Sequence, residues 1–182
     1  MQTYISILRG INVGGQKKIN MKELKALYES LGYQNVRTYI QSGNVVFEHK
    51  NNLHKDIPKQ VGEKIFEKYG FEVPVIVRTA DEIGSVLNTN PFLKKENILP
   101  DRLYVTFLAD EPQKEHLEKI KSYDYPPEEF TILGREVYLY CPTGYGEAKL
   151  NNNFFENKLK VTATTRNWRT VNELLNIANI NL

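Results

Sequence analysis

The stretch Arg9–Lys18 holds the residues in this sequence whose types and spacing are most suggestive of chemistry. It contains three glycines and lies between a predicted strand and a predicted helix. Glycines let backbone N–H groups converge, and a helix N-terminus favours anions. Arg9, Lys17 and Lys18 would add positive charge, so the stretch suits a phosphate or a nucleic-acid backbone. The glycines match neither the Walker nor the GxGxxG spacing, and glycines that only permit positive-φ turns are the commoner case.

A second polar cluster lies at the predicted hairpin turn in the segment 38–44. Gln41, Ser42 and Asn44 bring three polar side chains close to a tight turn. They could contact the same ligand as the glycine-rich stretch. Capping of the turn by Ser42 and Asn44 is the alternative and the commoner role of such residues.

A third stretch, 164–170, contains Trp168, the only tryptophan of the chain, between Arg166 and Arg169. An indole ring in that setting can stack on a base or on a guanidinium group. Packing of the ring against the domain body is the commoner alternative. Asn167 is predicted to cap the final helix, and a capping box of Thr170 with Glu173 is the alternative if the helix begins later.

The sequence offers no catalytic constellation. His49, His54 and His116 lie in polar stretches and lack metal-ligand spacing. Cys141 is the single cysteine, which excludes an internal disulfide and a cysteine-based zinc site; a buried, unreactive thiol is expected. No GxSxG motif is present. We therefore predict no metal and no cofactor, and we assign no catalytic residue.

Apolar periodicity predicts the elements that would position these stretches. In the first eighty residues we expect strand 3–9, a helix capped by Asn20 and Glu23, strand 35–41, a hairpin arm from 45 to 47, a helix carrying Leu53, Ile57, Val61 and Ile65, and strand 71–78, in which Pro74 indicates an edge position or a bulge. This strand and helix order is that of the ferredoxin-like unit.

A similar order follows in the second half, without visible residue identity to the first. We expect helix 79–87, linker 91–100, strand 102–108, helix 112–122, a hairpin of 129–133 with 136–141, helix 147–159, an extended piece 161–164 and a final helix. The predicted fold is α+β, with two ferredoxin-like halves built on antiparallel sheets and a C-terminal helix. The corresponding domains are 1–78, a connecting helix and linker 79–100, and 101–182. A single α+β domain with one large sheet is the competing fold.

Tyrosines suggest a further surface, because RNA-binding sheets of this layout stack bases on aromatic residues. The chain has eleven tyrosines. Strand alternation predicts that the sheet faces without helices carry Arg37, Tyr39, Tyr104, Thr106, Tyr138 and Tyr140. Burial of these faces inside the protein is the alternative, and the commoner one, because open aromatic faces make large exposed patches.

Composition and charge indicate a soluble globular protein. Hydrophobic residues make up 41% and charged residues 25% of the 182 residues, and the net charge of +2 is too small to indicate a nucleic-acid partner by itself. The charge is uneven: +4 over residues 1–50, −4 over 51–134 and +2 over 135–182. No signal peptide and no membrane-spanning run are visible, so a cytoplasmic location is expected.

The sequence resembles a bacterial family of unknown function, the one numbered 1697. The resemblance rests on LRGINVGG, TYIQSGN and TTRNW occurring together, and it covers nearly the whole chain. It implies a small cytoplasmic protein with two α+β, ferredoxin-like subdomains. It implies no activity, cofactor or catalytic residue.

The three stretches together predict one cleft that binds a phosphate-bearing ligand, a nucleotide or RNA. The candidate ligand-binding residues are Arg9, Gly10, Asn12, Gly14, Gly15, Lys17, Lys18, Gln41, Ser42, Asn44, Arg166, Asn167 and Trp168. An enzyme acting on a small anionic substrate is one alternative, although no general base is evident. A protein-interaction module that uses sheet edges or tyrosine faces is another.

Overall fold

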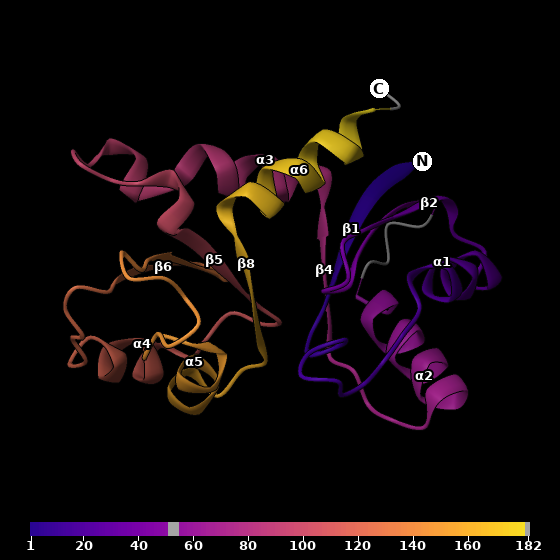
Figure 1. Cartoon of the computed structure of the whole chain (residues 1–182), viewed down its shortest axis with the longest axis horizontal. Coiled ribbons are helices and arrows are strands. Elements are labelled where there is room, and N and C mark those ends of the chain that lie inside the picture. The colour runs from indigo at the N-terminus through magenta and orange to yellow at the C-terminus, as the bar shows by residue number, and fades with distance from the viewer. Residues whose placement is uncertain (51–54, 181–182) are drawn as a thin grey trace. The chain divides into compact units, whose positions relative to one another are not determined.

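The computed structural model describes residues 1–50 and 55–180 and divides the chain into two compact units (Figure 1). The first unit is Met1–Gly84 together with the segment from Glu173, and the second is Ser85–Asn172. The sequence-based prediction had placed the whole C-terminal helix with the second half. None of the described helices has the length and apolar character needed to cross a membrane.

The first unit is a four-stranded antiparallel sheet with two helices on one face. Its elements are β1 Gln2–Leu8, α1 Met21–Ser30, β2 Gln34–Tyr39, β3 Asn44–His49, α2 Ile57–Tyr69 and β4 Val75–Thr79. The strand order β2-β3-β1-β4 and the antiparallel pairing of each neighbouring pair are those of a ferredoxin-like fold.

Burial of one apolar stripe on each helix explains why this layer forms. Leu24, Leu27 and Tyr28 of α1 are buried against the sheet, as are Val61 and Ile65 of α2. The apolar pattern that predicted these helices therefore marks their packing face. Leu53, which we had assigned to the second helix, lies outside the described residues.

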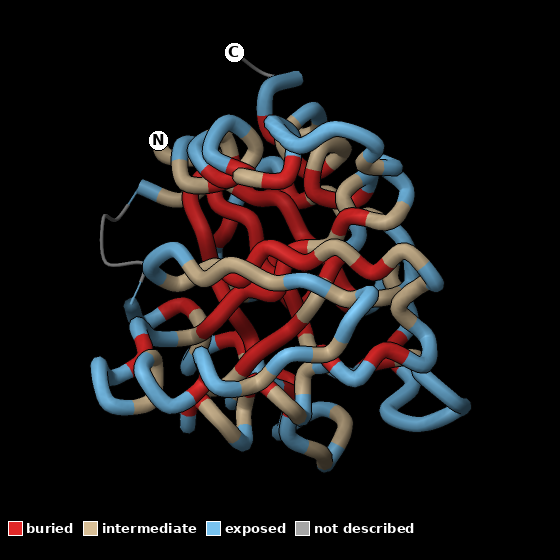
Figure 2. The backbone as a smooth tube through the Cα atoms, turned by 90° about the vertical axis from the view of Figure 1, so that its left-hand side faces the viewer, coloured by how far each residue is buried: buried red, intermediate tan, exposed pale blue. Residues whose placement is uncertain are grey.

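The second unit repeats this plan. Its elements are β5 Leu103–Leu108, α4 Lys114–Ile120, β6 Glu129–Leu133, β7 Glu136–Tyr140, α5 Asn152–Leu159 and β8 Ala163–Asn167. The antiparallel strand order β6-β7-β5-β8 is equivalent to that of the first unit. The predicted α+β fold with two ferredoxin-like halves is therefore confirmed, and the competing single sheet is wrong. Most residues of the central strands β1, β3, β5 and β7 are buried, and Figure 2 shows the buried segments of the backbone in red.

In each half, one helix follows the last strand without an intervening loop. Strand β4 leads into α3 Ala80–Thr89, and β8 leads into α6 Trp168–Asn179. The capping box predicted for α3 is formed, since the Thr79 N–H donates to Glu82 at 2.7 Å and the Glu82 N–H donates to Thr79 Oγ1 at 3.1 Å. The first capping alternative for α6 is also confirmed, because the Thr170 N–H donates to Asn167 Oδ1 at 2.8 Å.

Several predicted ends of helices and strands were wrong. At these positions the local sequence pattern and the hydrogen bonding of the folded chain favour different boundaries. Strand β4 begins at Val75, after Pro74, whose ring removes the N–H that a strand would use. Helix α5 begins only at Asn152, behind its cap Asn151, and so is shorter than predicted. Strand β8 continues to Asn167, beyond the predicted extended piece, because it pairs with β5 along its whole length.

Sheet pairing also reveals a residue-level repeat that the sequence comparison missed. Tyr4 to Leu8 of β1 correspond to Tyr104 to Leu108 of β5, and both segments read Tyr-x-x-x-Leu. Arg78 lies opposite Ile5, as Arg166 lies opposite Val105. The register therefore adds a few matching residues to the common element order on which the predicted repeat rests. The repeat is hidden because the corresponding strands lie 100 residues apart for β1 and β5 but 88 apart for β4 and β8.

The predicted tyrosine faces need a correction at Tyr104 and Thr106. Tyr104 packs with the core on the helix-covered face and stacks on Tyr145, with ring centroids 5.1 Å apart. Tyr138 lies on the opposite face, where it is buried and its hydroxyl donates to the Val86 carbonyl at 3.2 Å. These tyrosines therefore do not share one surface, and Tyr138 is not available for stacking on bases.

Candidate functional site

The glycine-rich stretch folds as a small hairpin between β1 and α1. Gly14 and Gly15 have φ values of +57° and +75°, and the Gln16 N–H donates to the Val13 carbonyl at 2.9 Å. A two-residue hairpin turn of type I′ requires positive φ at both central positions, which glycine adopts without a steric penalty. Two of the three glycines are therefore explained by the turn, as the alternative interpretation stated.

Asn12 connects this loop to two other segments. Its Nδ2 donates to the Ile19 carbonyl at 3.0 Å and to the Gln41 carbonyl at 2.9 Å, and its Oδ1 accepts from the Ile19 N–H at 2.9 Å. Asn12 itself has a φ of +55°, a conformation that asparagine tolerates better than most residues. Its side chain therefore positions the loop, and the predicted contact of Asn12 with a ligand stays a prediction.

The hairpin turn 40–43 packs directly against the glycine-rich loop. Gly43 has a φ of +84°, and a Cβ placed there would lie 2.7 Å from Ile11 Cδ1. Asn44 is buried, and its Nδ2 donates to the Tyr39 carbonyl at 3.0 Å and to Ser42 Oγ at 3.1 Å. Asn44 thus stabilises the turn, which is the role that we had given as the alternative for this motif.

A groove of about 620 Å³ lies where these segments meet, all within the first unit. We call it the loop groove. It is lined by Asn12, Gly15, Lys18, Ile19, Asn20, Glu23, Gln41 and Tyr69. The structure thus brings together the glycine-rich stretch and the hairpin turn, two of the three stretches predicted to share a cleft, with the start of α1. The sequence analysis missed Tyr69, which reaches the groove from the end of α2.

The charges around the loop groove are mixed. Lys18 is exposed and has no partner among the described residues. Glu23 accepts from the Tyr69 hydroxyl at 2.8 Å and lies 3.5 Å from Lys68 Nζ. The Tyr69 hydrogen bond, followed by the charge of Lys68, lowers the pKa of Glu23, while burial and then Glu23 raise the pKa of Tyr69 to about 12.

Lys17, one of the predicted contacts, and the N-terminus of α1 are already engaged. Lys17 Nζ donates to the Glu72 carbonyl at 2.7 Å and does not line the groove. Asn20 Oδ1 accepts from the N–H groups of Lys22 at 2.9 Å and Glu23 at 3.4 Å. Part of the anion-binding capacity of the α1 N-terminus is therefore satisfied by its own cap.

The third predicted stretch belongs to the second unit. Arg166 is buried, and its Nη1 donates to the Thr165 carbonyl at 2.9 Å and to Thr164 Oγ1 at 3.2 Å. Burial lowers the pKa of Arg166 to about 10, which leaves it protonated at neutral pH. Trp168 opens α6, where its carbonyl accepts from Asn172 at 2.8 Å. That this stretch shares a cleft with the other two stays a prediction.

Arg78 is a residue that the sequence analysis passed over. It occupies in β4 the place of Arg166 in β8, is fully buried, and donates from Nη1 to the Val77 carbonyl at 3.0 Å. A buried guanidinium group needs several compensating contacts. Arg78 and Arg166 place this requirement at equivalent positions of the two halves. An arginine followed by a helix-capping residue at the end of both last strands was the available signal.

Catalytic groups are scarce in the described part of the chain. No cluster of three or more histidine, cysteine or acidic residues suited to a metal ion occurs among residues 1–50 and 55–180. Burial raises the pKa of the Cys141 thiol to about 12, so it is not a thiolate at neutral pH. Glu23 is the acidic residue lining the loop groove, and its lowered pKa makes it a weak general base.

Fold and site together define a protein of two ferredoxin-like halves with a polar groove beside a glycine hairpin. The family comparison matches residues 1–138 to the family described as "Protein of unknown function (DUF1697)". The chain belongs to this family, as its sequence motifs had suggested.

The solved structures include a similar chain, described as "conserved bacterial protein SP0830 from Streptococcus pneumoniae". The two chains are 20% identical, and the alignment covers 98% of this chain and 99% of that one with a TM-score of 0.73. At this identity the likeness concerns the fold alone. No curated protein matches the chain.

Proposed function

We propose that the protein binds a phosphate-bearing ligand, a nucleotide or RNA, in the loop groove. The observation that carries the proposal is the amine of Lys18, which has no partner among the described residues, in a groove where Asn12 bonds both Ile19 and Gln41. A cytoplasmic location is part of this proposal. The ligand would be held by contacts, without covalent chemistry.

Three physical features support an anionic ligand. Lys18 provides a cation that no described residue neutralises, and α1 directs its positive dipole end at the groove. The negative charge of Glu23 is offset by Lys68 at 3.5 Å. Gln41 adds an amide that can donate to a phosphate oxygen or to a base edge.

The third predicted stretch belongs to the second unit, and its part in ligand binding is a separate expectation. Asn167 would supply a polar contact and Trp168 a ring for stacking on a base, whereas the buried guanidinium of Arg166 already donates to the Thr165 carbonyl and to Thr164 Oγ1. A fluorescence titration of Trp168 tests this part by itself, because the chain has a single tryptophan. A nucleotide that binds without any change in tryptophan fluorescence would remove the stretch from the site.

Calorimetric titration at low salt tests the groove. The probes are inorganic phosphate, adenosine monophosphate and a short single-stranded RNA. We expect Lys18→Gln to weaken binding about fivefold or more, because a charge-assisted hydrogen bond is lost. Lys22→Gln is the matched control, since Lys22 is an exposed lysine of α1 that does not line the groove. Absence of binding to all three probes, or equal losses in the two variants, would refute the proposal.

A further inference from the structure

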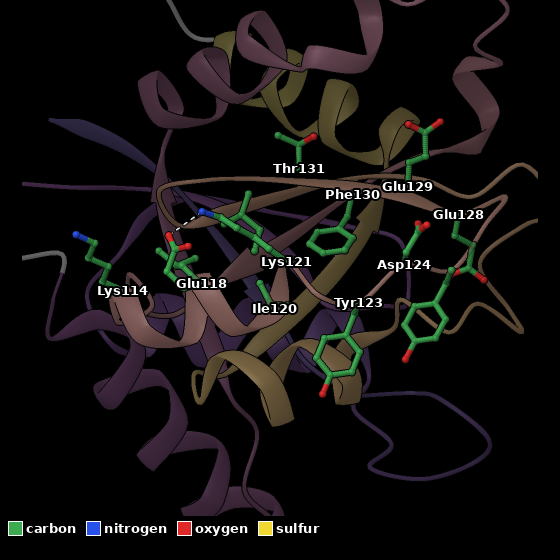
Figure 3. A pocket seen from close by; sticks show the side chains of 13 residues that line it. Lys114, Glu118, Ile120, Lys121, Tyr123, Asp124, Glu128, Glu129, Phe130 and Thr131 are labelled. Carbon is green, nitrogen blue, oxygen red and sulfur yellow. Dashed lines mark hydrogen bonds and ion pairs between the residues drawn. The ribbon is translucent and has the colours of Figure 1, made fainter.

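A second groove, of about 750 Å³, lies in the second unit between α4, the following loop and β6 (Figure 3). We call it the edge groove. Strand β6 is the outermost strand of its sheet, with β7 as its one neighbour. The groove is unrelated to the glycine hairpin, so it is independent of the function proposed above.

The lining shows that the edge groove runs along the open side of β6. Four consecutive residues, Glu129 to Ile132, line it. Successive side chains of a strand point to opposite faces, so a groove lined by all four must follow the edge that both faces share. That edge carries the backbone groups that β7 does not use.

The hairpin register identifies these backbone groups. Leu133 pairs with Glu136 across a two-residue turn, so this pair and the pairs of Thr131 and Glu129 exchange hydrogen bonds with β7. The N–H and C=O groups of Phe130 and Ile132 therefore point away from β7. No other described strand pairs with them.

The equivalent edge of the first unit is protected. Strand β2 has an irregular register between Gln34 and Arg37, and such bulges disrupt pairing with further strands. Strand β6 keeps an unbroken register from Glu129 to Leu133. The helix beside it is also shorter, with seven residues in α4 against ten in α1. The edge strand β6 of the second unit therefore stays open to pairing, whereas the irregular register of β2 protects the equivalent edge of the first unit.

The side chains of the edge groove indicate what would bind there. Its floor is apolar, with Leu117 and Ile120 from α4 and with Phe130, whose ring lies in the middle of Figure 3. The lining also includes two lysines and four acidic residues, an excess of two negative charges. Asp124 has no partner among the described residues, whereas Lys121 is paired with Glu118 at 2.7 Å.

We propose that β6 is a docking edge for an extended segment of another protein. The segment adds as a fifth strand, bonds the outward backbone groups of Phe130 and Ile132, and directs alternate apolar side chains to the groove floor. A basic side chain of the segment pairs with Asp124. Backbone bonds supply affinity, while the apolar spacing and the basic residue supply selectivity.

A capped hexapeptide of alternating valine and lysine tests the proposal by calorimetry at low salt. The same peptide with every backbone nitrogen methylated is the control, because it keeps its side chains but cannot pair. We expect Ile132→Pro, which removes one outward N–H at an edge where proline is tolerated, to weaken binding about tenfold. We expect Asp124→Asn to weaken it about threefold, and the exposed Asp110→Asn, outside the groove, to leave it unchanged.

Amide hydrogen exchange gives a readout that survives a failure of Ile132→Pro to fold. Peptide binding should slow exchange at Phe130 and Ile132 and leave Thr131, already bonded to β7, unchanged. No binding of the capped peptide, or equal binding of its methylated form, would overturn the proposal. A dimer of this chain that persists with excess peptide and that Ile132→Pro abolishes would assign the edge to a second copy and overturn it as well.

Discussion

Asn12 contributes more to the positioning of the candidate site than any charged residue does. Its carboxamide makes three hydrogen bonds that join the glycine hairpin, the entry to α1 and the hairpin turn. An asparagine in this loop is equally suited to contacting a ligand and to positioning the loop. The sequence could therefore predict that Asn12 matters but not which atoms it contacts.

We expect Asn12→Ala to lower the free energy of unfolding by about 2–3 kcal/mol, because three hydrogen bonds are lost at about 1 kcal/mol each. Urea denaturation measures the change. Gln16→Ala, at an exposed position of the same loop, should alter stability by less than about 0.5 kcal/mol. Equal effects of the two variants would contradict the role given to Asn12.

Glu23 and Tyr69 give the loop groove a defined pH dependence. Burial and then Glu23 raise the pKa of Tyr69 to about 12. We expect Glu23→Gln to lower the pKa of Tyr69 while leaving it above 10.0, because burial, the larger cause, remains. The difference between the tyrosinate absorbance titrations of parent and variant isolates this tyrosine from the others.

The same pair makes a prediction at acid pH. Because the folded-state pKa of Glu23 is lowered, its ionised form adds stability above the unfolded pKa of about 4.3, and this stability is lost as the pH falls through the folded pKa. The urea midpoint of the parent should therefore fall more steeply on acidification than that of Glu23→Gln. Parallel curves would show that the hydrogen bond has no energetic consequence.

At the scale of elements, the sequence predicted the α-helices and the strands, but it assigned an irregular linker to a segment that contains the 3-10 helices Pro91–Lys94 and Pro100–Arg102. The other errors fall where tertiary pairing decides. Strand β8 was underestimated because Thr164, Thr165 and Asn167 are polar and lack a strand pattern, yet they pair with β5. The face of Tyr104 was misassigned because alternation cannot tell which of two apolar faces the helices cover. Correcting either error requires knowing which residues of neighbouring strands pair, and the sequence alone does not give this.

The close contact at Gly43 gives a prediction for the hairpin between β2 and β3. A methyl group there would meet Ile11 and Leu8 side chains at 2.7–2.9 Å and would also hold a φ of +84°. We expect Gly43→Ala to destabilise the protein by about 2–4 kcal/mol, the sum of strain and overpacking. Thermal and urea denaturation measure the change.

Gly134 provides the matched control for that prediction. Its φ is +60° in the turn between β6 and β7, but no atom lies within 4 Å of the added Cβ. Gly134→Ala should therefore cost only the backbone strain, about 1–2 kcal/mol. If both variants lose the same stability, the contact of Gly43 with Ile11 has no role in joining the loop to the turn.

At the scale of the whole molecule, the chain repeats one plan twice with matching residues at matching pairing positions. Arg78 and Arg166 are the next-to-last residues of the last strands, and Thr79 and Asn167, which end these strands, cap the helices that follow. Identity is confined to a few positions and the spacing differs between the halves, so a comparison of sequence alone could show only the common order of elements.

The single cysteine reports on the integrity of the second unit. Cys141 is fully buried, and burial, with a smaller contribution from Glu128, raises its pKa to about 12. We expect no reaction with a thiol reagent in native buffer near pH 8 and complete reaction in denaturant. Rapid reaction of the native protein would contradict the burial of Cys141.

The first unit takes residues from both ends of the chain, since its members run from Met1 to Gly84 and resume at Glu173. A truncation after Gly84 therefore removes Leu175, whose Cδ2 lies 4.0 Å from the Cβ position of Gly84. A circular permutant opened between Asn172 and Glu173 would instead make this unit continuous in sequence. Such a rearranged gene is the natural starting point for producing either half in isolation.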